Sequence, residues 1–428
     1  MTTPHDTLLD RIAARRAQVA VIGLGYVGLP LAVELAKAGF CTVGIDLDAR
    51  KVDALNAGTS YIGDIATDEV APLVRAGRLR AATGFDALQE CDAVSICVPT
   101  PLSKTHDPDL SYIVAAADEV AKYVHAGMLI VLESTTYPGT TEEIIVPRMV
   151  GRGLAVGVDV FVAFSPERID PGRKDYVLKN TPKIVGGTTP ACREAVVALY
   201  RCVTQQVVPV SSAAAAEMAK LLENTFRAVN IALVNEVLMM CDKLGLDAWE
   251  VIQAAATKPY GFMKFTPGPG VGGHCIPLDP QYLSWKLRTL NYNARFIQLA
   301  EEVNASMPGY WVNKVAEALN EDRKAMKGSR VLVLGVTYKP DIADLRESPA
   351  IDIVKLLAQR GADVSFHDPF VKTLAPEGLA AGYAALSAET VAAADCVLVV
   401  TNHSSYDWAW IRQHARRIVD SRHVLASL

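Results

Sequence analysis

Hydrophobic and polar positions at the start of the chain follow the patterns of strands and helices in turn. From Gln18, an apolar run, a glycine-rich turn and an amphipathic stretch lead to a second apolar run that ends at Asp46. Short apolar runs bounded by turn residues are typical of buried strands, and apolar residues at steps of three and four are typical of helices. The pattern predicts a βαβ unit, with further strands of a parallel sheet at 93–101, 128–136 and 160–168.

The middle of the chain has a helical pattern. Residues 213–245 contain no proline and no internal glycine, and their apolar residues recur at helical spacing, so we expect one long helix there. Helical periodicity continues over 247–326, around a loop rich in glycine and proline. After Gly328, strands and helices alternate again. The pattern therefore predicts two related α/β halves around a helical spacer, with domains at 1–212, 213–327 and 328–428.

Composition and charge narrow the class of protein. The 428 residues carry a net charge of -5, which argues against a general nucleic-acid binder, so an anionic ligand must be held by local groups. Eight scattered cysteines without a C-x-x-C pair are typical of a reducing cytoplasm. We expect no export signal and no membrane span, because the sequence has neither an apolar leader nor a run of about 18 uncharged apolar residues.

Three glycines form a G-x-G-x-x-G motif directly after the first predicted strand. Gly23 permits a tight turn, Gly25 lets the backbone approach a pyrophosphate, and Gly28 lets the helix pack on the strand. The N-terminus of the following helix offers free N–H groups to phosphates. The motif predicts a dinucleotide site.

The acid at the end of the second predicted strand indicates which dinucleotide binds. Asp46 would accept hydrogen bonds from the adenosine ribose and repel a 2′-phosphate, which favours NAD over NADP. Arg50 and Lys51 leave the alternative open, because either cation could counter a 2′-phosphate.

The second α/β half lacks the glycine motif. Lys339 and Arg346 stand near the end of its first strand instead, and such cations suit a different phosphate ligand. The alternative is that they are solvated loop cations.

The sequence GPGVGGHCIPLDP contains the strongest local signal for chemistry. A single cysteine is usually a buried structural one, but Cys275 lies in a glycine-rich loop that can present its sulfur and direct backbone N–H groups at a developing oxyanion. Asp279 is favoured over the adjacent His274 as a base. No second Cys/His pair stands at ligand spacing, so no metal is expected.

Two polar residues of the long predicted helix, Lys220 and Asn224, are four residues apart and share a face. By themselves they are more typical of a solvated helix surface than of a catalytic pair.

Together these features resemble the UDP-glucose/GDP-mannose dehydrogenase family of nucleotide-sugar 6-dehydrogenases, from Gln18 to Arg422. The motifs that carry the resemblance occur in the family's order: GLGYVGLPLA, VPTP, ESTTYPGT, FSPERIDPG, EMAKLLENTFRAVNIALVNE, PGPGVGGHCIP with Asp279, and GVTYKPDIADLRESP. The resemblance implies an α/β fold with two Rossmann-like, doubly wound domains joined by a central all-helical domain with a long helix. It implies that the first domain binds NAD, the central one dimerises and the last binds the UDP-sugar.

The resemblance also implies roles for single residues. Contacts to NAD are implied for Gly23, Gly25, Tyr26, Val27, Gly28, Asp46, Lys51, Thr100 and Thr135. Catalysis is implied for Cys275, Lys220, Asn224, Asp279 and Glu167. Substrate contacts are implied for Glu167, Arg168, Lys220, Asn224, Phe265, Gly272, Lys339 and Arg346.

Two departures from the family pattern affect these implications. UDP-glucose members carry an acid four residues after the glutamate of S-P-E, where this chain has Pro171, which leaves that acid's contact with the cofactor open. They also read G-G-S-C-F at the nucleophile, whereas GGHCIP and its flanks resemble the UDP-N-acetylglucosamine 6-dehydrogenase branch.

The implied reaction is a four-electron oxidation of the sugar's 6-alcohol to a carboxylate, with two NAD per catalytic cycle. Lys220 and Asp279 would take the alcohol proton, Cys275 would form a thiohemiacetal and then a thioester, and Glu167 or Asp279 would activate the hydrolytic water. The implied setting is a cytoplasmic homodimer, or a higher homo-oligomer formed through the central helices, in polysaccharide biosynthesis such as that of capsule or lipopolysaccharide O-antigen.

The alternatives are the same chemistry on UDP-N-acetylmannosamine or UDP-glucose, an inactive sugar-nucleotide sensor, and a redox-sensing cysteine protein. A sugar-nucleotide sensor would not need a nucleophile or the residues that act with it. A redox sensor usually has a resolving cysteine, which is not evident here.

Overall fold

The computed structural model describes residues 2–63, 65–101, 107–169, 175–273 and 275–426. The chain divides into two compact units, Met1–Glu223 with Arg288–Leu290, and Asn224–Leu287 with Asn291–Leu428. Two residues named above, Pro171 and His274, lie outside the described residues.

The first unit is built on an eight-stranded sheet of order β3-β2-β1-β4-β5-β6-β7-β8. Its strands are β1 (Gln18–Ile22), β2 (Cys41–Ile45), β3 (Leu79–Ala82), β4 (Ala93–Ile96), β5 (Leu129–Leu132), β6 (Phe161–Phe164), β7 (Lys183–Gly187) and β8 (Val207–Val210). The strands from β1 to β6, which include all those predicted for this half, are parallel as expected, and β7 is antiparallel to β6. The strand order reverses direction beside β1, as in a doubly wound sheet, and ligands of such sheets bind at that reversal.

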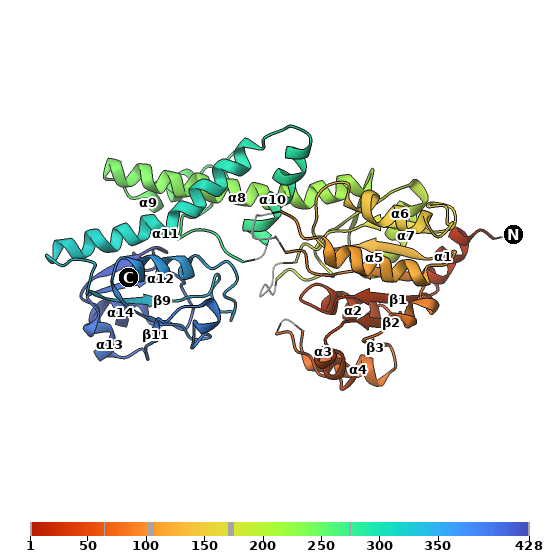
Figure 1. Cartoon of the computed structure of the whole chain (residues 1–428), viewed down its shortest axis with the longest axis horizontal. Helices are drawn as coiled ribbons and strands as arrows, with labels where there is room; N and C mark the ends of the chain where they lie inside the picture. Colours follow the sequence, from red (N-terminus) through yellow and green to blue (C-terminus); the bar gives the residue numbers. More distant parts are fainter. Residues whose placement is uncertain (1, 64, 102–106, 170–174, 274, 427–428) are drawn as a thin grey trace. The chain divides into compact units, whose positions relative to one another are not determined.

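Helices cover both faces of this sheet (Figure 1). They are α1 (Pro4–Ala13), α2 (Gly28–Lys37), α3 (Ala49–Asn56), α4 (Thr67–Arg75), α5 (Ser111–Tyr123), α6 (Val146–Val150) and α7 (Pro190–Tyr200), with a short 3-10 helix, η1 (Asp86–Glu90), and a short π-helix, η2 (Thr141–Ile145). Strands β4, β5 and β6 are fully buried, which explains why their sequences read as continuous apolar runs.

The predicted long helix is confirmed as α8 (Ala213–Leu244), of 32 residues. It is followed by Gly245, whose φ of 69° suits a glycine just past a helix C-terminus. The division between the two units falls within this helix.

The second unit combines the helices α9 (Ala248–Ala255), α10 (Cys275–Thr289) and α11 (Arg295–Glu321) with a five-stranded parallel sheet. The strands, in the order β11-β10-β9-β12-β13, are β9 (Arg330–Leu334), β10 (Asp363–His367), β11 (Gly382–Tyr383), β12 (Cys396–Val399) and β13 (Ile418–Asp420). They are accompanied by α12 (Pro349–Gln359), η3 (Ala375–Glu377), α13 (Ala388–Ala393) and α14 (Trp408–His414). The order repeats that of the first five strands of the larger sheet, so the predicted second Rossmann-like half is confirmed.

Helix α11 lies along α12 and shares a hydrophobic core with the second sheet (Figure 1). Val312 and Leu319 of α11 are fully buried in the same cluster as Val331 of β9 and Leu357 of α12. This common core makes the helices and the last α/β domain one compact unit, and the boundaries at 212/213 and 327/328 stay predictions.

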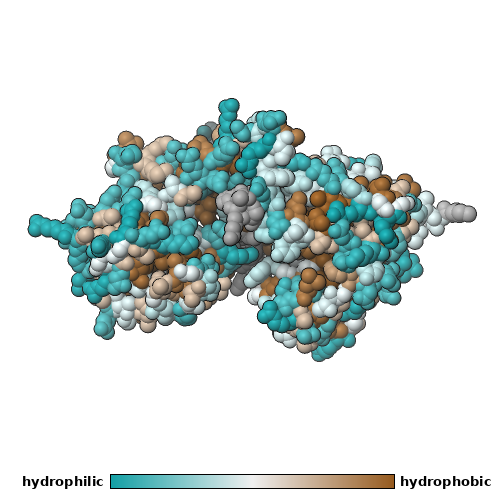
Figure 2. Space-filling model, in the orientation of Figure 1, coloured by the Kyte–Doolittle hydropathy of each residue, from teal (hydrophilic) through white to brown (hydrophobic). Residues whose placement is uncertain are grey.

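The surface seen in Figure 2 is mainly hydrophilic, with hydrophobic residues in separate spots. Among the described helices, none is both long and apolar enough to cross a membrane.

Candidate functional site

The glycine motif forms the turn between β1 and α2. Gly23 has a φ of 89°, and a Cβ there would lie 2.6 Å from the Cys97 carbonyl oxygen. A Cβ on Gly28 would lie 1.8 Å from the Gly23 carbonyl oxygen, whereas one on Gly25 would meet no described residue other than its chain neighbours within 4 Å. Packing therefore requires the first and third glycines but does not explain the second. The N-cap residue Val27 makes no side-chain hydrogen bond to α2. Leu29 N–H already donates to the Gly25 carbonyl at 3.1 Å and Pro30 has no N–H, so Gly28 supplies the first-turn N–H that can face a phosphate.

Asp46 lies directly after β2, and its two oxygens hold the surrounding turns. One oxygen accepts a hydrogen bond from Leu24 N–H at 2.8 Å and pairs with Lys51 at 2.9 Å, and the other accepts from Asp48 N–H at 2.9 Å. Arg50 pairs with Asp48 at 2.8 Å, and its hydrogen bonds lower the pKa of Asp48 to about 2. Because carboxylates already neutralise both cations, the arrangement favours NAD, without a 2′-phosphate, over NADP.

The other residues expected near the cofactor follow neighbouring strands. Thr100 is buried after β4, Thr135 is half-buried after β5, and Tyr26, which follows Gly25, is 60% exposed. The Ser134 hydroxyl donates to the Val98 carbonyl at 2.8 Å and so ties the ends of β4 and β5 together. These threonines thus lie at the carboxyl ends of adjacent parallel strands, where dinucleotides bind in such folds.

A buried ion pair that the sequence analysis did not identify lies at the end of β5. The ammonium group of Lys183 contacts Glu133 at 2.7 Å, and Tyr200 donates a hydrogen bond to the same carboxylate. Both ionic side chains are at most 4% exposed. Burial opposes the charge on Lys183, but Glu133 and Glu167 outweigh it, so the pKa of Lys183 is raised. The sequence signal that could have identified this pair is that Glu133 and Lys183 are charged residues at the edges of apolar runs.

Glu167 lies beside this pair, with one carboxylate oxygen occupied. Oε1 accepts hydrogen bonds from the N–H groups of Arg168 and Ile169, both at 2.6 Å. Oε2 is buried, has no hydrogen-bond partner in the described structure and lies 3.9 Å from the Lys183 ammonium. Glu167 therefore keeps one oxygen able to accept a proton. Arg168 already has protein partners, because its guanidinium contacts Glu223 of α8 at 2.7 Å.

The structure brings together two of the predicted catalytic residues in the second unit. Asn224 of α8 donates a hydrogen bond from Nδ2 to Asp279 Oδ2 at 2.5 Å, and both side chains are buried. Cys275 is exposed and lies one turn before Asp279 on α10, so both lie on one face of that helix. Lys220, one turn before Asn224 on α8, is 9% exposed.

The expectation that Cys275 lies within a loop is wrong, because α10 begins at this residue. Pro277 falls in the first helical turn, where a proline costs no hydrogen bond. A helix N-terminus favours negative charge, so it can stabilise both a thiolate and an oxyanion formed beside it.

The glycines before Cys275 pack against the loop that follows β9. A Cβ on Gly272 would lie 2.6 Å from the Glu347 carbonyl oxygen, and one on Gly273 would lie 2.7 Å from the Tyr338 ring. Gly273 N–H donates to the Arg346 carbonyl at 2.9 Å, and Gly268 N–H donates to the Asn235 side chain at 2.9 Å. The expectation that these N–H groups face an oxyanion is therefore wrong for Gly268 and Gly273. Close loop packing also accounts for the glycine at 272, so its contact with substrate stays a prediction.

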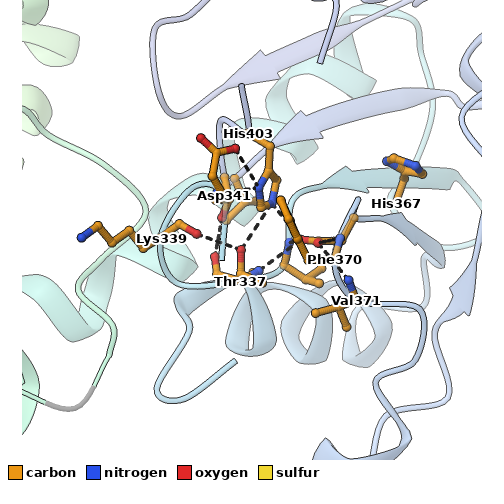
Figure 3. A network of polar contacts seen from close by, with 12 residues as sticks. Thr337, Lys339, Asp341, His367, Phe370, Val371 and His403 are labelled. Atoms are coloured by element: carbon orange, nitrogen blue, oxygen red, sulfur yellow. Dashed lines mark hydrogen bonds and ion pairs between the residues drawn. The ribbon is translucent and has the colours of Figure 1, made fainter. Parts of the chain in front are cut away.

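The remaining predicted substrate residues lie in the same unit. Phe265 is half-buried and contacts the ring of Phe226 edge to face, with centroids 5.8 Å apart. Arg346 is exposed and pairs with Asp344 at 2.7 Å. Lys339 lies in the loop after β9, and Figure 3 shows its side chain extending away from a buried polar network. In the described parts of the chain, no three His, Cys, Asp or Glu side chains gather as a metal site would need.

Comparison with known proteins identifies the family. Models of the UDP-glucose/GDP-mannose dehydrogenase family match residues 17–204 as its NAD binding domain, 214–306 as its central domain and 332–427 as its UDP binding domain. The chain is 39% identical over 356 residues to the UDP-N-acetyl-D-glucosamine 6-dehydrogenase of Pseudomonas aeruginosa, covering 83% of each chain. It is 37% identical to the NDP-N-acetyl-D-galactosaminuronic acid dehydrogenase of Ralstonia nicotianae, covering 94% of this chain and 95% of that protein.

The fold agrees with a solved structure of the same kind. The UDP-D-ManNAc dehydrogenase of Pyrococcus horikoshii superposes with a TM-score of 0.86 at 34% identity, covering 95% of both chains. The resemblance inferred from the sequence is thus confirmed. The chain belongs to the UDP-glucose/GDP-mannose dehydrogenase family and is an NAD-dependent oxidoreductase that acts on a UDP-sugar.

Proposed function

We propose that this enzyme oxidises the 6-hydroxymethyl group of UDP-N-acetylglucosamine to the carboxylate, through a covalent intermediate on Cys275. The observation that carries the proposal is the placement of Cys275, exposed at the start of α10 and one turn from the buried Asn224–Asp279 pair. The identity of 39% to a UDP-N-acetyl-D-glucosamine 6-dehydrogenase and the GGHCIP sequence support this sugar. The names of other relatives keep N-acetylmannosamine and N-acetylgalactosamine derivatives as rivals.

In this proposal the first unit binds NAD at the β1–α2 turn. Gly25 lets the pyrophosphate approach the backbone, Asp46 accepts hydrogen bonds from the ribose hydroxyls, and Thr100 and Thr135 line the strand ends. Tyr26 and Val27 contribute the backbone of the turn, and Lys51 keeps Asp46 in place. When bound, NAD accepts a hydride at each of the two oxidation stages, so two NAD are consumed per sugar.

Cys275 captures the aldehyde that the first oxidation produces. Its sulfur adds to the aldehyde carbon, and the resulting thiohemiacetal oxygen needs donors. Asn224 spends one Nδ2 hydrogen on Asp279 and keeps a second for this oxygen, while Lys220 supplies a positive charge one turn away. Capture prevents loss of the aldehyde and leads to a thioester.

The remaining steps are proton transfers. Asp279, held by Asn224, accepts the alcohol proton through a water molecule, and Lys220 acts with it by stabilising the negative charge that develops on the alcohol oxygen. Glu167 accepts a proton from the water that hydrolyses the thioester, because its Oε2 is buried and has no hydrogen-bond partner in the described structure. Phe265, Gly272 and Arg168 border the sugar, and Lys339 and Arg346 neutralise the diphosphate.

We also propose that α8 contributes to a homodimer or higher homo-oligomer. Exposed apolar side chains recur along one face of this helix at steps of four and seven residues. They are Met218, Leu222, Phe226, Leu233, Met240 and Leu244, all at least 37% exposed.

The experiment is a comparison of UDP-hexoses as substrates, with NADH counted per sugar, in wild type and in Cys275→Ser. We expect the highest kcat/KM with UDP-N-acetylglucosamine and two NADH per sugar. Because serine ionises far less readily than cysteine, Cys275→Ser should form at most about one NADH per sugar and leave a sugar adduct or aldehyde detectable by mass spectrometry. Cys41→Ser is the matched control, since Cys41 is also exposed, and it should behave as wild type.

Two results would refute parts of the proposal separately. A preference for UDP-glucose would reject the assigned sugar and leave the mechanism standing. Full four-electron oxidation by Cys275→Ala at the wild-type rate would reject covalent catalysis.

A further inference from the structure

The two sheets place an acid at equivalent positions. Asp46 directly follows β2 and accepts a hydrogen bond from Leu24 N–H at 2.8 Å. Asp368 directly follows β10 and accepts from Val336 N–H, also at 2.8 Å. A glycine with positive φ, Gly23 or Gly335, precedes the donor in each case. The exposures differ, because the side chain of Asp46 is 11% exposed and that of Asp368 is 0% exposed.

A buried histidine covers the second acid. The His403 ring donates from Nε2 to Asp368 Oδ2 at 2.9 Å, and its Nδ1 lies 3.0 Å from Asp341 N–H, from which it accepts a hydrogen bond (Figure 3). This pair of contacts requires the neutral ring with its proton on Nε2. Burial would raise the pKa of Asp368, but hydrogen bonds from His403 and from backbone N–H groups keep it lowered. The Asp368 carboxylate thus has its hydrogen-bond donors within the protein itself.

These contacts hold the segment that carries Lys339. The Thr337 hydroxyl donates to the Lys339 carbonyl at 3.0 Å, and His403 holds the N–H of Asp341. Asp341 has a φ of 63°, a left-handed conformation that is uncommon for residues other than glycine and that the surrounding contacts help to maintain. The backbone on both sides of Lys339 is therefore fixed, while its side chain extends away from the network (Figure 3).

We propose that His403, together with Asp368 and Thr337, positions Lys339 for the diphosphate of the UDP-sugar. The three side chains form an anchor that orders residues 337–341 before substrate binds. This lowers the entropy that the segment would otherwise lose on binding. The inference rests on the proposed function, because it takes Lys339 as a diphosphate contact. His403 itself is a positioning residue and does not touch the reacting atoms.

Two substitutions of His403 test the contacts of its two ring nitrogens separately. His403→Asn retains an acceptor near the place of Nδ1, and His403→Gln retains a donor near the place of Nε2 but loses the acceptor for Asp341 N–H. We expect His403→Gln to weaken UDP binding about tenfold in calorimetric titration, the effect of one lost hydrogen bond of ordinary strength. The KM for UDP-N-acetylglucosamine should rise to match, with kcat and NAD affinity nearly unchanged. His403→Asn should stay closer to wild type, because backbone N–H groups still satisfy Asp368.

A double-variant cycle tests whether His403 acts through Lys339. If it does, Lys339→Ala/His403→Gln should bind UDP no more weakly than Lys339→Ala alone. Additive losses would overturn the inference, as would unchanged UDP affinity in a folded His403→Gln. Unchanged UDP affinity in Lys339→Ala would instead refute the proposed diphosphate contact. If His403→Gln does not fold, Thr337→Val removes the hydroxyl that holds the Lys339 carbonyl and should weaken UDP binding several-fold, and unchanged affinity there would overturn the inference.

Discussion

At the scale of single residues, Lys183 is a buried cation that faces acidic side chains. Its ammonium group lies 2.7 Å from Glu133 and 3.9 Å from Glu167, so one buried positive charge faces two carboxylates. This charge attracts Oε2 of Glu167, the proposed base of the hydrolysis step. A residue outside the predicted catalytic set thus sets the charge balance around a residue within it.

Replacing Lys183 should destabilise the fold strongly. Lys183→Met leaves Glu133 buried without its ionic partner, and removal of one member of a buried pair typically costs about 3–5 kcal/mol. Lys122→Met is the control, because Lys122 forms a surface pair with Glu119 at 2.7 Å, and such pairs contribute about 0–1 kcal/mol. Urea unfolding followed by circular dichroism measures both. Equal shifts of the two midpoints would contradict the importance of the buried pair.

The same residues show how far sequence reasoning reaches at this scale. Asn224 and Asp279 were named from motifs, and the structure places them in hydrogen-bond contact. Glu133 and Lys183 were not named, because their pairing joins the end of β5 to the start of β7 across the intervening strand. Apolar periodicity predicts strands, but it does not specify which strand lies next to which.

At the scale of elements, the β1–α2 turn contains one glycine that packing requires and one that packing does not require. A Cβ on Gly28 would overlap the backbone of Gly23, whereas a Cβ on Gly25 would have no described residue other than its chain neighbours within 4 Å. The two glycines have the same size and belong to the same motif, and yet only one is required by packing.

Alanine should therefore affect the stability of the protein at one position and the affinity for NAD at the other. Gly28→Ala forces a Cβ to 1.8 Å from a carbonyl oxygen, so we expect overpacking that destabilises the protein by about 1–3 kcal/mol or more. Gly25→Ala should keep wild-type stability and weaken NAD binding about tenfold or more, because its methyl group occupies the approach to the pyrophosphate. Thermal unfolding and calorimetric titration with NAD test both variants. Wild-type NAD affinity in Gly25→Ala would show that the pyrophosphate binds elsewhere.

Helix α10 shows where prediction from the sequence failed at this scale. The proline and glycine residues around Cys275 indicate a loop, and they do form one up to Gly273. The helix then begins at Cys275 with Pro277 in its first turn. Proline marks a helix start as well as a break, and sequence alone does not distinguish the two when glycines precede it.

At the scale of the whole molecule, two sheets with related strand order are associated with different ligands. The first has the glycine turn, and the second has a loop with Lys339 and Arg346 at the corresponding strand end. The sequence pattern does not predict the order of the strands in a sheet, but it predicts two α/β halves, and these are confirmed. The difference between their turns is what predicts a division of labour.

Loss of a cation in the second half should affect one ligand only. Arg346→Ala should weaken UDP binding about tenfold, because a guanidinium bonded to a diphosphate is a charge-assisted contact, and should leave NAD binding unchanged. Arg360→Ala is the control, since Arg360 of the same unit is exposed and bonds to Asn313 at 2.7 Å. Separate calorimetric titrations with UDP and NAD measure the effect. A selective loss of NAD affinity would reverse the assignment of the two halves.

The buried acid of the second sheet also bears on how cofactor sites are recognised in sequences. Asp368 has the same backbone donor position as Asp46, but His403 supplies a further hydrogen bond to it from within the protein. Because its side chain is 0% exposed, Asp368 supports the turn after β10 and presents no surface to a nucleotide. An acid at the end of the second strand of such a sheet can thus serve as an internal support, and its presence in a sequence does not by itself demonstrate that a cofactor is bound.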